Sequence, residues 1–255
     1  MTECGHALQA SIEEVFSEHE FFFKPPSSNK GGAGILVRKN MFENIDIINK
    51  DQFLTCTCNT GKCIVESIWV KLSSKSSQNI IVGSIYRHPN GNLTHFNDLY
   101  SNLLDSIKER QTCVIGGDFN IDHLQFEKKQ IGEFLTTNLE NNFTPCITLP
   151  TRLTTHSATL IDQIYLKLPI KRLQSKVHSG NLYCSISDHL MNFVLLELEN
   201  KTTKDRPYVR LFTKSKIELF KENAPNDPPL LSTNPNSNHS HLNLQYAFPE
   251  FLENY

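Results

Sequence analysis

The stretch Cys113-Val114-Ile115-Gly116-Gly117-Asp118-Phe119-Asn120 decides the fold class. Three apolar residues followed by two glycines and a polar pair predict a buried strand that ends in a loop at a sheet edge, where side chains reach a ligand. Asp118 and Asn120 lie two residues apart, so in extended backbone both side chains would share one face. A carboxylate that activates water would then stand beside an amide that donates to a phosphate oxygen. The alternative, which the pattern alone leaves open, is an Asx turn that closes the strand.

The segments on both sides of this stretch alternate between strand and helix patterns, which predicts a layered α/β domain. Apolar residues at helical spacing predict a helix over 95–110 with Thr94 as its N-cap, and a second helix near 128–140. Short β-rich runs bounded by turn residues predict the strands. The expected strands are 34–37, 64–70, 80–86, 113–116 and 193–198.

Composition divides the chain into three parts. We expect one domain over residues 1–200, a basic linker over 201–221 and a disordered tail over 222–255, because the tail is rich in Asn, Pro and Ser. The formal net charge of −2 supplies no general field for nucleic acid, so any DNA contact must be local. Seven scattered cysteines predict reduced thiols in an intracellular setting, nuclear or cytoplasmic. The sequence has neither a signal peptide nor a long apolar run. We therefore expect a protein that is not secreted and has no membrane partner.

Two further elements carry acids. Asp188 and His189 are adjacent just before the last expected strand, so they can serve one phosphate only if the loop kinks or if they approach it from different sides. Asp162 interrupts the apolar run 160–165, and a buried acid needs a partner. His189 is the expected partner, with Asp162 fixing the imidazole tautomer. The alternative is that backbone donors satisfy Asp162.

The run Ile85-Tyr86-Arg87-His88-Pro89-Asn90 leaves a strand through a Pro-Asn turn. It offers a phenol, a guanidinium and an amide to a phosphodiester, although an ordinary hairpin would have the same pattern. A thiolate metal site at Cys56, Cys58 and Cys63 is a weaker hypothesis than plain hairpin cysteines.

These elements together closely resemble the endonuclease/exonuclease/phosphatase superfamily, and within it the endonuclease of non-LTR (LINE-type) retrotransposons. The resemblance covers about residues 1–215 and depends on seven phrases in the right order and spacing. The phrases are Thr2-Glu3, Lys30-Gly31-Gly32-Ala33-Gly34-Ile35, Ile85-Tyr86-Arg87-His88-Pro89-Asn90, Gly116-Gly117-Asp118-Phe119-Asn120, Pro150-Thr151-Arg152, Ser157-Ala158-Thr159-Leu160-Ile161-Asp162 and Ile186-Ser187-Asp188-His189. The resemblance implies a four-layer α/β/β/α sandwich, two mixed β-sheets flanked by helices, with the site at one rim.

The resemblance also implies roles for individual residues. Glu3 would hold Mg²⁺, with Mn²⁺ as the alternative ion, and Asp188 would support the metal or the water. Asp118 would activate the attacking water, while His189, oriented by Asp162, would stabilise the phosphorane. The residues implied to contact phosphate or DNA are Tyr86, Arg87, Asn90, Asn120 and Ser187.

The implied function is a Mg²⁺-dependent nick in DNA that leaves a 3′-hydroxyl and a 5′-phosphate. Members of the family begin with a strand whose Asn helps bind the metal, and Met1 lies two residues before Glu3, so we expect a domain that lacks its first strand. The reverse transcriptase expected in an intact element does not follow in this sequence. Two alternatives stay open: another phosphodiesterase or phosphatase of the superfamily, and a non-catalytic remnant with weak nucleic-acid or protein contacts.

Overall fold

The computed structural model describes residues 12, 14–26, 31–54, 65–73, 79–169, 176–184 and 187–197. The chain divides into two compact units, residues 1–204 and 205–255, and every described residue belongs to the first. Glu3, the three cysteines at 56, 58 and 63, the linker and the tail lie outside the described residues. In the part of the chain that is described, no helix is long and apolar enough to span a membrane.

A six-stranded mixed sheet forms the centre of this unit. Its strands run in the order β3 (Asn44–Ile47), β4 (Val65–Ser73), β5 (Ile80–Arg87), β6 (Thr112–Asp118), β10 (Asp162–Lys167) and β7 (Thr144–Pro145). Only β5 and β6 pair in parallel among these six, and the other neighbours are antiparallel. The pairing of β5 with β6 is close, because a Cβ on Gly117 would lie 1.8 Å from the carbonyl oxygen of Ile85. Glycine is therefore required where β6 approaches its carboxyl end.

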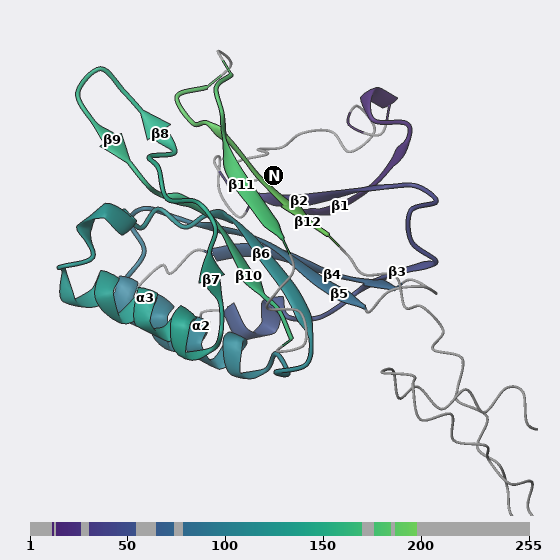
Figure 1. Ribbon diagram of the computed structural model, residues 1–255, viewed down its shortest axis with the longest axis horizontal. Helices are drawn as coiled ribbons and strands as arrows, with labels where there is room; N and C mark the ends of the chain where they lie inside the picture. Colours follow the sequence, from purple (N-terminus) through teal and green to yellow (C-terminus); the bar gives the residue numbers. More distant parts are fainter. Residues whose placement is uncertain are drawn as a thin grey trace, which may run out of the picture. The chain divides into compact units, whose positions relative to one another are not determined.

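Two helices, α2 (Leu93–Asp105) and α3 (Lys129–Glu140), pack side by side on one face of this sheet (Figure 1). Their apolar faces supply buried aromatic rings, among them Phe96, Tyr100 and Phe134. These rings pack against Ile85 and Ile115 from the strands, so burial of an apolar stripe on an apolar sheet face stabilises this layer.

The expected N-cap of α2 is wrong, because the helix begins at Leu93 and its cap is Asn92, whose Oδ1 accepts the His95 backbone N–H at 3.0 Å. The Thr94 hydroxyl instead accepts a hydrogen bond from the Gln130 amide of α3 at 2.8 Å. The helix also ends at Asp105, five residues before the expected end. Lys50 and Lys167 donate to the carbonyls of residues 106 and 107, which satisfies groups that a longer helix would have paired internally.

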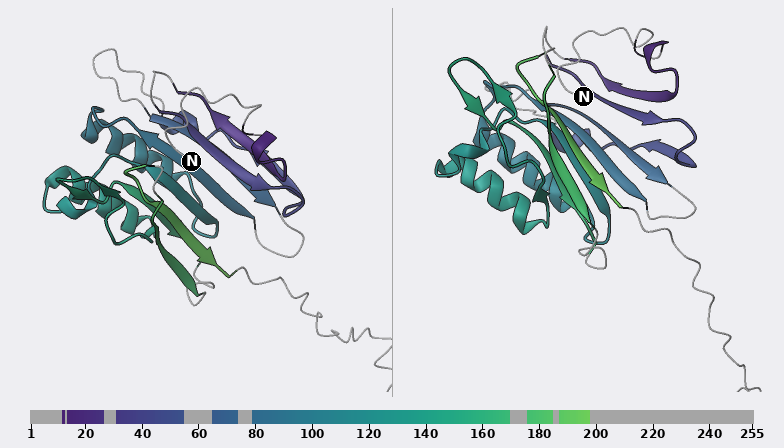
Figure 2. Two further views of the ribbon diagram at one scale, coloured as in Figure 1. Left: turned by 90° about the horizontal axis from the view of Figure 1, so that it is seen from above. Right: turned by 45° about the horizontal axis from the view of Figure 1, so that its top comes forward.

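The opposite face of the sheet carries two antiparallel hairpins, as Figure 2 shows. The first joins β1 (His19–Lys24) to β2 (Ala33–Arg38), and it buries Phe22 and Ile35 in a second apolar cluster. The second joins β11 (Val177–Leu182) to β12 (Met191–Leu196), which begins two residues before the expected strand. Helices, mixed sheet and a second β layer confirm the predicted α/β sandwich. Within the described residues the second layer consists of two separate hairpins.

A short hairpin, β8 (Arg152–Leu153) with β9 (Ala158–Thr159), projects from the rim where β6 ends and β10 begins (Figure 1). The segment that leads into it is held from two sides. Gln163 makes a reciprocal pair of hydrogen bonds with the backbone of Ile147, at 2.8 and 2.9 Å. Asn181 of β11 donates to the carbonyl of Pro150 at 2.9 Å. This rim is where the polar residues singled out by the sequence converge.

Candidate active site

A row of side chains crosses four neighbouring strands at one level of the sheet. Glu66 on β4 pairs with Tyr86 on β5, Tyr86 pairs with Asp118 on β6, and Asp118 pairs with Asp162 on β10. Ile85, one residue inward from Tyr86, and Ile115, three residues inward from Asp118, pack under the helices, so the alternation of strands places the row on the opposite face. All four side chains are largely buried. The sheet thus presents three carboxylates and one phenol in a line, about 4.8 Å apart by strand spacing.

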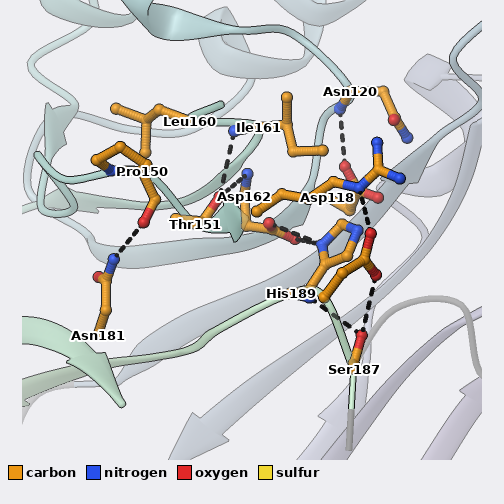
Figure 3. A network of polar contacts seen from close by, with 12 residues as sticks. Asp118, Asn120, Pro150, Thr151, Leu160, Ile161, Asp162, Asn181, Ser187 and His189 are labelled. Carbon is orange, nitrogen blue, oxygen red and sulfur yellow. Dashed lines mark hydrogen bonds and ion pairs between the residues drawn. The ribbon is translucent and has the colours of Figure 1, made fainter. Parts of the chain in front are cut away.

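His189 completes the row at its β10 end. Its Nδ1 lies 2.9 Å and 3.2 Å from the two carboxylate oxygens of Asp162, which is the partnership that the sequence predicted (Figure 3). One side-chain ligand atom from each of Asp118, Asp162 and His189 lies within 4.8 Å of the others. Three segments that are distant in the sequence therefore meet at one point.

The electrostatics of this group favour a protonated imidazole. The hydrogen bond with Asp162 raises the pKa of His189, burial opposes the shift, and the negative charges of Asp162, Asp118 and Asp188 reinforce it. An ionised carboxylate can accept hydrogen bonds but cannot donate them, so Nδ1 of His189 carries the hydrogen that points to Asp162. The remaining nitrogen, Nε2, is then the one that can donate to an anionic oxygen near neutral pH.

Thr151 holds both members of this pair in place. Its hydroxyl oxygen accepts the backbone N–H groups of Ile161 and Asp162, at 3.2 and 3.0 Å, and its carbonyl accepts the N–H of Leu190 at 2.7 Å (Figure 3). The side chain is fully buried. The phrase that contains Thr151 could be found in the sequence, but its role could not, because hydrogen bonds to distant backbone leave no local pattern.

Asp188 pairs with Arg152. The Arg152 Nε donates to Asp188 Oδ2 at 2.8 Å, and this hydrogen bond lowers the pKa of the Asp188 carboxyl. Ser187 accepts the backbone N–H of His189 at 3.1 Å. Asp188 and His189 therefore have different side-chain partners, Arg152 and Asp162. Asp188 does not belong to the group of three ligand atoms, so its metal role stays a prediction.

The loop after β6 differs from the extended chain that was expected. The strand ends at Asp118, whose Oδ1 accepts the N–H of Asn120 at 2.9 Å, and Asn120 has φ = 49°. The chain therefore turns, and the expectation that both side chains share one face of a strand is wrong. The Asx turn, held open as the alternative, is present beside the row of acids. The Asn120 amide donates to the carbonyl of Arg87 at 2.8 Å, which uses one of its two N–H groups.

Arg87 binds backbone carbonyls of the neighbouring loops, and its expected role as a phosphate ligand stays a prediction. Its guanidinium is buried and donates to four backbone carbonyls at 2.8 to 3.1 Å. The carbonyls belong to His88, Gly91, Phe119 and Asn120. The N–H groups of a guanidinium can donate to carbonyl oxygens as well as to phosphate oxygens. Here they bind the turn after β5 to the loop after β6.

Tyr86 and Asn90 lie at different depths. Tyr86 is buried in the row, with the His88 ring against its edge at 5.1 Å between centroids, whereas Asn90 is exposed on the turn. Glu66 is a site residue that the sequence analysis missed. Its signal was available, since it interrupts a strand pattern in the same way as Asp162.

Asp118 and Asp162 are neighbouring carboxylates of a kind that fits a divalent cation. Hard ions such as Mg²⁺ prefer carboxylate oxygens, and both residues supply them. These two carboxylates are therefore compatible with a metal ion at the rim, and the imidazole of His189 could join them as a ligand only in its neutral form.

Comparisons with known proteins agree with this fold. The family model described as "Endonuclease-reverse transcriptase" matches residues 80–193, from the start of β5 into β12. No curated protein sequence matches the chain.

Solved structures resemble the fold. The endonuclease domain of TRAS1, a telomere-specific non-LTR retrotransposon, is 15% identical with a TM-score of 0.52, over 73% of this chain and 81% of that one. A humanized D. rerio TDP2 is 14% identical with a TM-score of 0.55, over 77% and 83%. An endonuclease/exonuclease/phosphatase family protein from Leptotrichia buccalis is 11% identical with a TM-score of 0.51, over 74% and 75%. The chain therefore has the fold of the endonuclease/exonuclease/phosphatase proteins, and its residues 80–193 are similar to the "Endonuclease-reverse transcriptase" family.

Proposed function

We propose that this protein is a Mg²⁺-dependent DNA endonuclease of a non-LTR retrotransposon, which nicks one strand and leaves a 3′-hydroxyl and a 5′-phosphate. The observation that carries the proposal is the meeting of Asp118, Asp162 and His189 within 4.8 Å at the rim. The match to the "Endonuclease-reverse transcriptase" model and the likeness to the TRAS1 domain support the choice among superfamily activities.

In the proposed reaction Asp118 takes a proton from the attacking water. The His189 imidazolium donates from Nε2 to a non-bridging oxygen of the scissile phosphate, where negative charge develops. Asp162 keeps the ring in that tautomer through the bond at Nδ1, a pairing that the raised pKa of His189 reinforces. Tyr86 and the second N–H of Asn120 provide donors to the same anion, and Ser187 and Asn90 flank it on the exposed side.

A bound Mg²⁺ would offset the phosphate charge and help the 3′-oxygen leave. Asp118 and Asp162 are the described carboxylates that lie together and could bind it. Glu3 and Asp188 are the metal residues that the resemblance assigns. DNA as the substrate is supported by a related fold, since D. rerio TDP2 has been solved in complex with a single-strand DNA product, with a TM-score of 0.51 to this chain.

The test is nicking of supercoiled plasmid in Mg²⁺. We expect Asp118→Asn and His189→Ala to lower the rate at least about 100-fold, since each removes a proton-transfer group. Matched controls are Asp46→Asn on β3 and His178→Ala on β11, both exposed and far along the sheet from the rim. Sealing of the nick by a DNA ligase would show the 3′-hydroxyl and 5′-phosphate ends.

Two outcomes would change the assignment. Turnover of a soluble phosphodiester without plasmid nicking would favour another phosphodiesterase of the superfamily. Equal activity in the wild type, Asp118→Asn and His189→Ala would mean that this site performs no chemistry and would favour a non-catalytic remnant.

A further inference from the structure

We propose that Glu66 is a positioning residue that acts through Tyr86, fixing the phenol ring at the phosphate end of the site. The inference depends on the proposed endonuclease function for its kinetic consequence. Its structural content can be measured without any activity.

Register places the two side chains together. Glu66 and Tyr86 are directly paired residues of β4 and β5, and the same pairing continues from Tyr86 to Asp118. Paired residues on one face of an antiparallel sheet have Cβ atoms about 4.5–5.5 Å apart, which is within contact range for long side chains. Glu66 is therefore the cross-strand neighbour of Tyr86 on the side away from the three-residue metal group.

The Gly31-Gly32 turn shows that the two side chains face the same point. A Cβ on Gly31 would lie 2.7 Å from Glu66 Oε2 and 3.0 Å from Tyr86 Cε1. The carboxylate oxygen and the ring edge are thus at most about 5.7 Å apart, the sum of these two distances. Gly31 has φ = 116°, a conformation that side-chain-bearing residues rarely adopt, so this close approach is built from glycine.

The Glu66 carboxylate accepts a hydrogen bond from the turn that contains Gly31 and Gly32. Gly32 donates its backbone N–H to Glu66 Oε2 at 3.5 Å, and Glu66 is only 2% exposed. A buried acid persists only where such partners satisfy it. The edge of an aromatic ring is its positive part, so a carboxylate beside the Tyr86 ring edge favours one ring orientation.

The Glu66 carboxylate has no place in the metal group, because the three ligand atoms there come from Asp118, Asp162 and His189. Tyr86 separates it from them in the register. Its effect on the reaction therefore passes through the phenol ring.

A double-mutant cycle tests the kinetic consequence on supercoiled plasmid. We expect Glu66→Ala to lower kcat for nicking about tenfold or more with KM changed less than about twofold, and Glu66→Gln, which keeps the acceptor and the shape, to retain most of the rate. In a Tyr86→Ala background, Glu66→Ala should change kcat less than twofold. Equal losses in both backgrounds would mean a general structural role and would overturn the proposal.

The second measurement needs no activity. The ring signals of Tyr86 can be assigned by NMR from their loss in Tyr86→Phe, and they should move in Glu66→Ala but not in the exposed control Glu20→Ala. If the wild type fails to nick while the ring signals move, the proposed function fails and the positioning stands. Unmoved ring signals in a folded Glu66→Ala protein overturn the positioning whatever the nicking result.

Discussion

The hydroxyl oxygen of Thr151 accepts hydrogen bonds from two backbone amides. It contacts neither the Asp162 carboxylate nor the His189 imidazole, yet the positions of both depend on it. The Ile161 and Asp162 amides that it accepts lie in the buried start of β10. Removing the oxygen would leave both amides without this acceptor in a place that water does not reach. An unsatisfied buried amide costs about 1–3 kcal/mol, so the residue acts on stability and on geometry at once.

We therefore expect Thr151→Val, which keeps the shape but loses the oxygen, to lower the free energy of unfolding by about 1–3 kcal/mol. It should also slow plasmid nicking, because the Asp162 carboxylate loses a constraint on its backbone. Thr151→Ser is the matched variant, since it keeps the oxygen and should keep most of the nicking rate. Urea unfolding and nicking rates check this, and a Val variant as fast as the wild type would contradict it.

At the scale of single residues, the sequence could predict a contact where a buried charged group requires a partner. A carboxylate inside the strand pattern at Asp162 needed a partner, and the imidazole of His189 was the available one, so their contact was predictable. Arg87 was not predictable, because backbone carbonyls satisfy a guanidinium as well as a phosphate does. Glu66 carried the same signal as Asp162 and was missed because no motif phrase contained it.

At the scale of elements, the start of α2 shows how a cap works. Asn92 has extended backbone and its side chain accepts the third N–H of the helix, one of the four that no helical carbonyl can pair. The sequence analysis named Thr94 as the cap, although Asn92, two residues earlier, is also a suitable residue type. The contact of Thr94 with Gln130 across the helix pair decides between them, and this is tertiary information.

Asn92→Ala should lower the free energy of unfolding by about 0.5–2 kcal/mol through the lost cap. Thr94→Ala is the natural comparison, and we expect a smaller loss because it removes only an exposed contact with Gln130. Chemical unfolding of the two variants in parallel measures both. A larger loss at Thr94 than at Asn92 would mean that the helix begins where the sequence alone suggested.

At the scale of the whole molecule, a buried histidine ties the loop after β6 to β10. His123 Nδ1 lies 2.8 and 3.0 Å from the carbonyl oxygens of Ile121 and Leu160, so it carries the hydrogen. Its Nε2 therefore accepts the O–H of Tyr165 at 2.6 Å. Burial lowers the pKa of His123, against the opposing effect of those carbonyls and of Asp122. The folded protein holds this ring neutral.

This pKa shift makes stability depend on pH in a defined direction. Below about pH 6.5 the unfolded chain binds a proton at His123 that the folded protein refuses, so the free energy of unfolding falls as the pH drops from there toward the lowered folded pKa. One proton contributes at most about 1.4 kcal/mol per pH unit. Urea unfolding from pH 8 to pH 5 should show a shallower acid slope in His123→Gln than in the wild type. The exposed control His178→Gln should keep the wild-type slope, and identical slopes in all three proteins would contradict the assignment.

The architecture of the whole domain was predictable because seven sequence motifs in a fixed order identify a fold. The spacing of these motifs along the chain does not show which of their residues lie close together in the folded protein. Strand pairing supplied what was missing: Glu66, Tyr86, Asp118 and Asp162 share a level of the sheet only because their strands are adjacent and in register. The division of the second layer into two hairpins is likewise a matter of pairing between distant segments, which local patterns do not encode.

The backbone bonds at the foot of the projecting β8–β9 hairpin have a mechanical consequence. Leu153 donates to the carbonyl of Asp188 and Leu190 donates to that of Thr151, so the chain on either side of His189 is clamped to the hairpin. A movement of the hairpin would therefore be transmitted to the imidazole of His189. Tilting the hairpin would either separate the ring from the Asp162 carboxylate or break those two backbone hydrogen bonds, while the acids on the sheet would keep their positions.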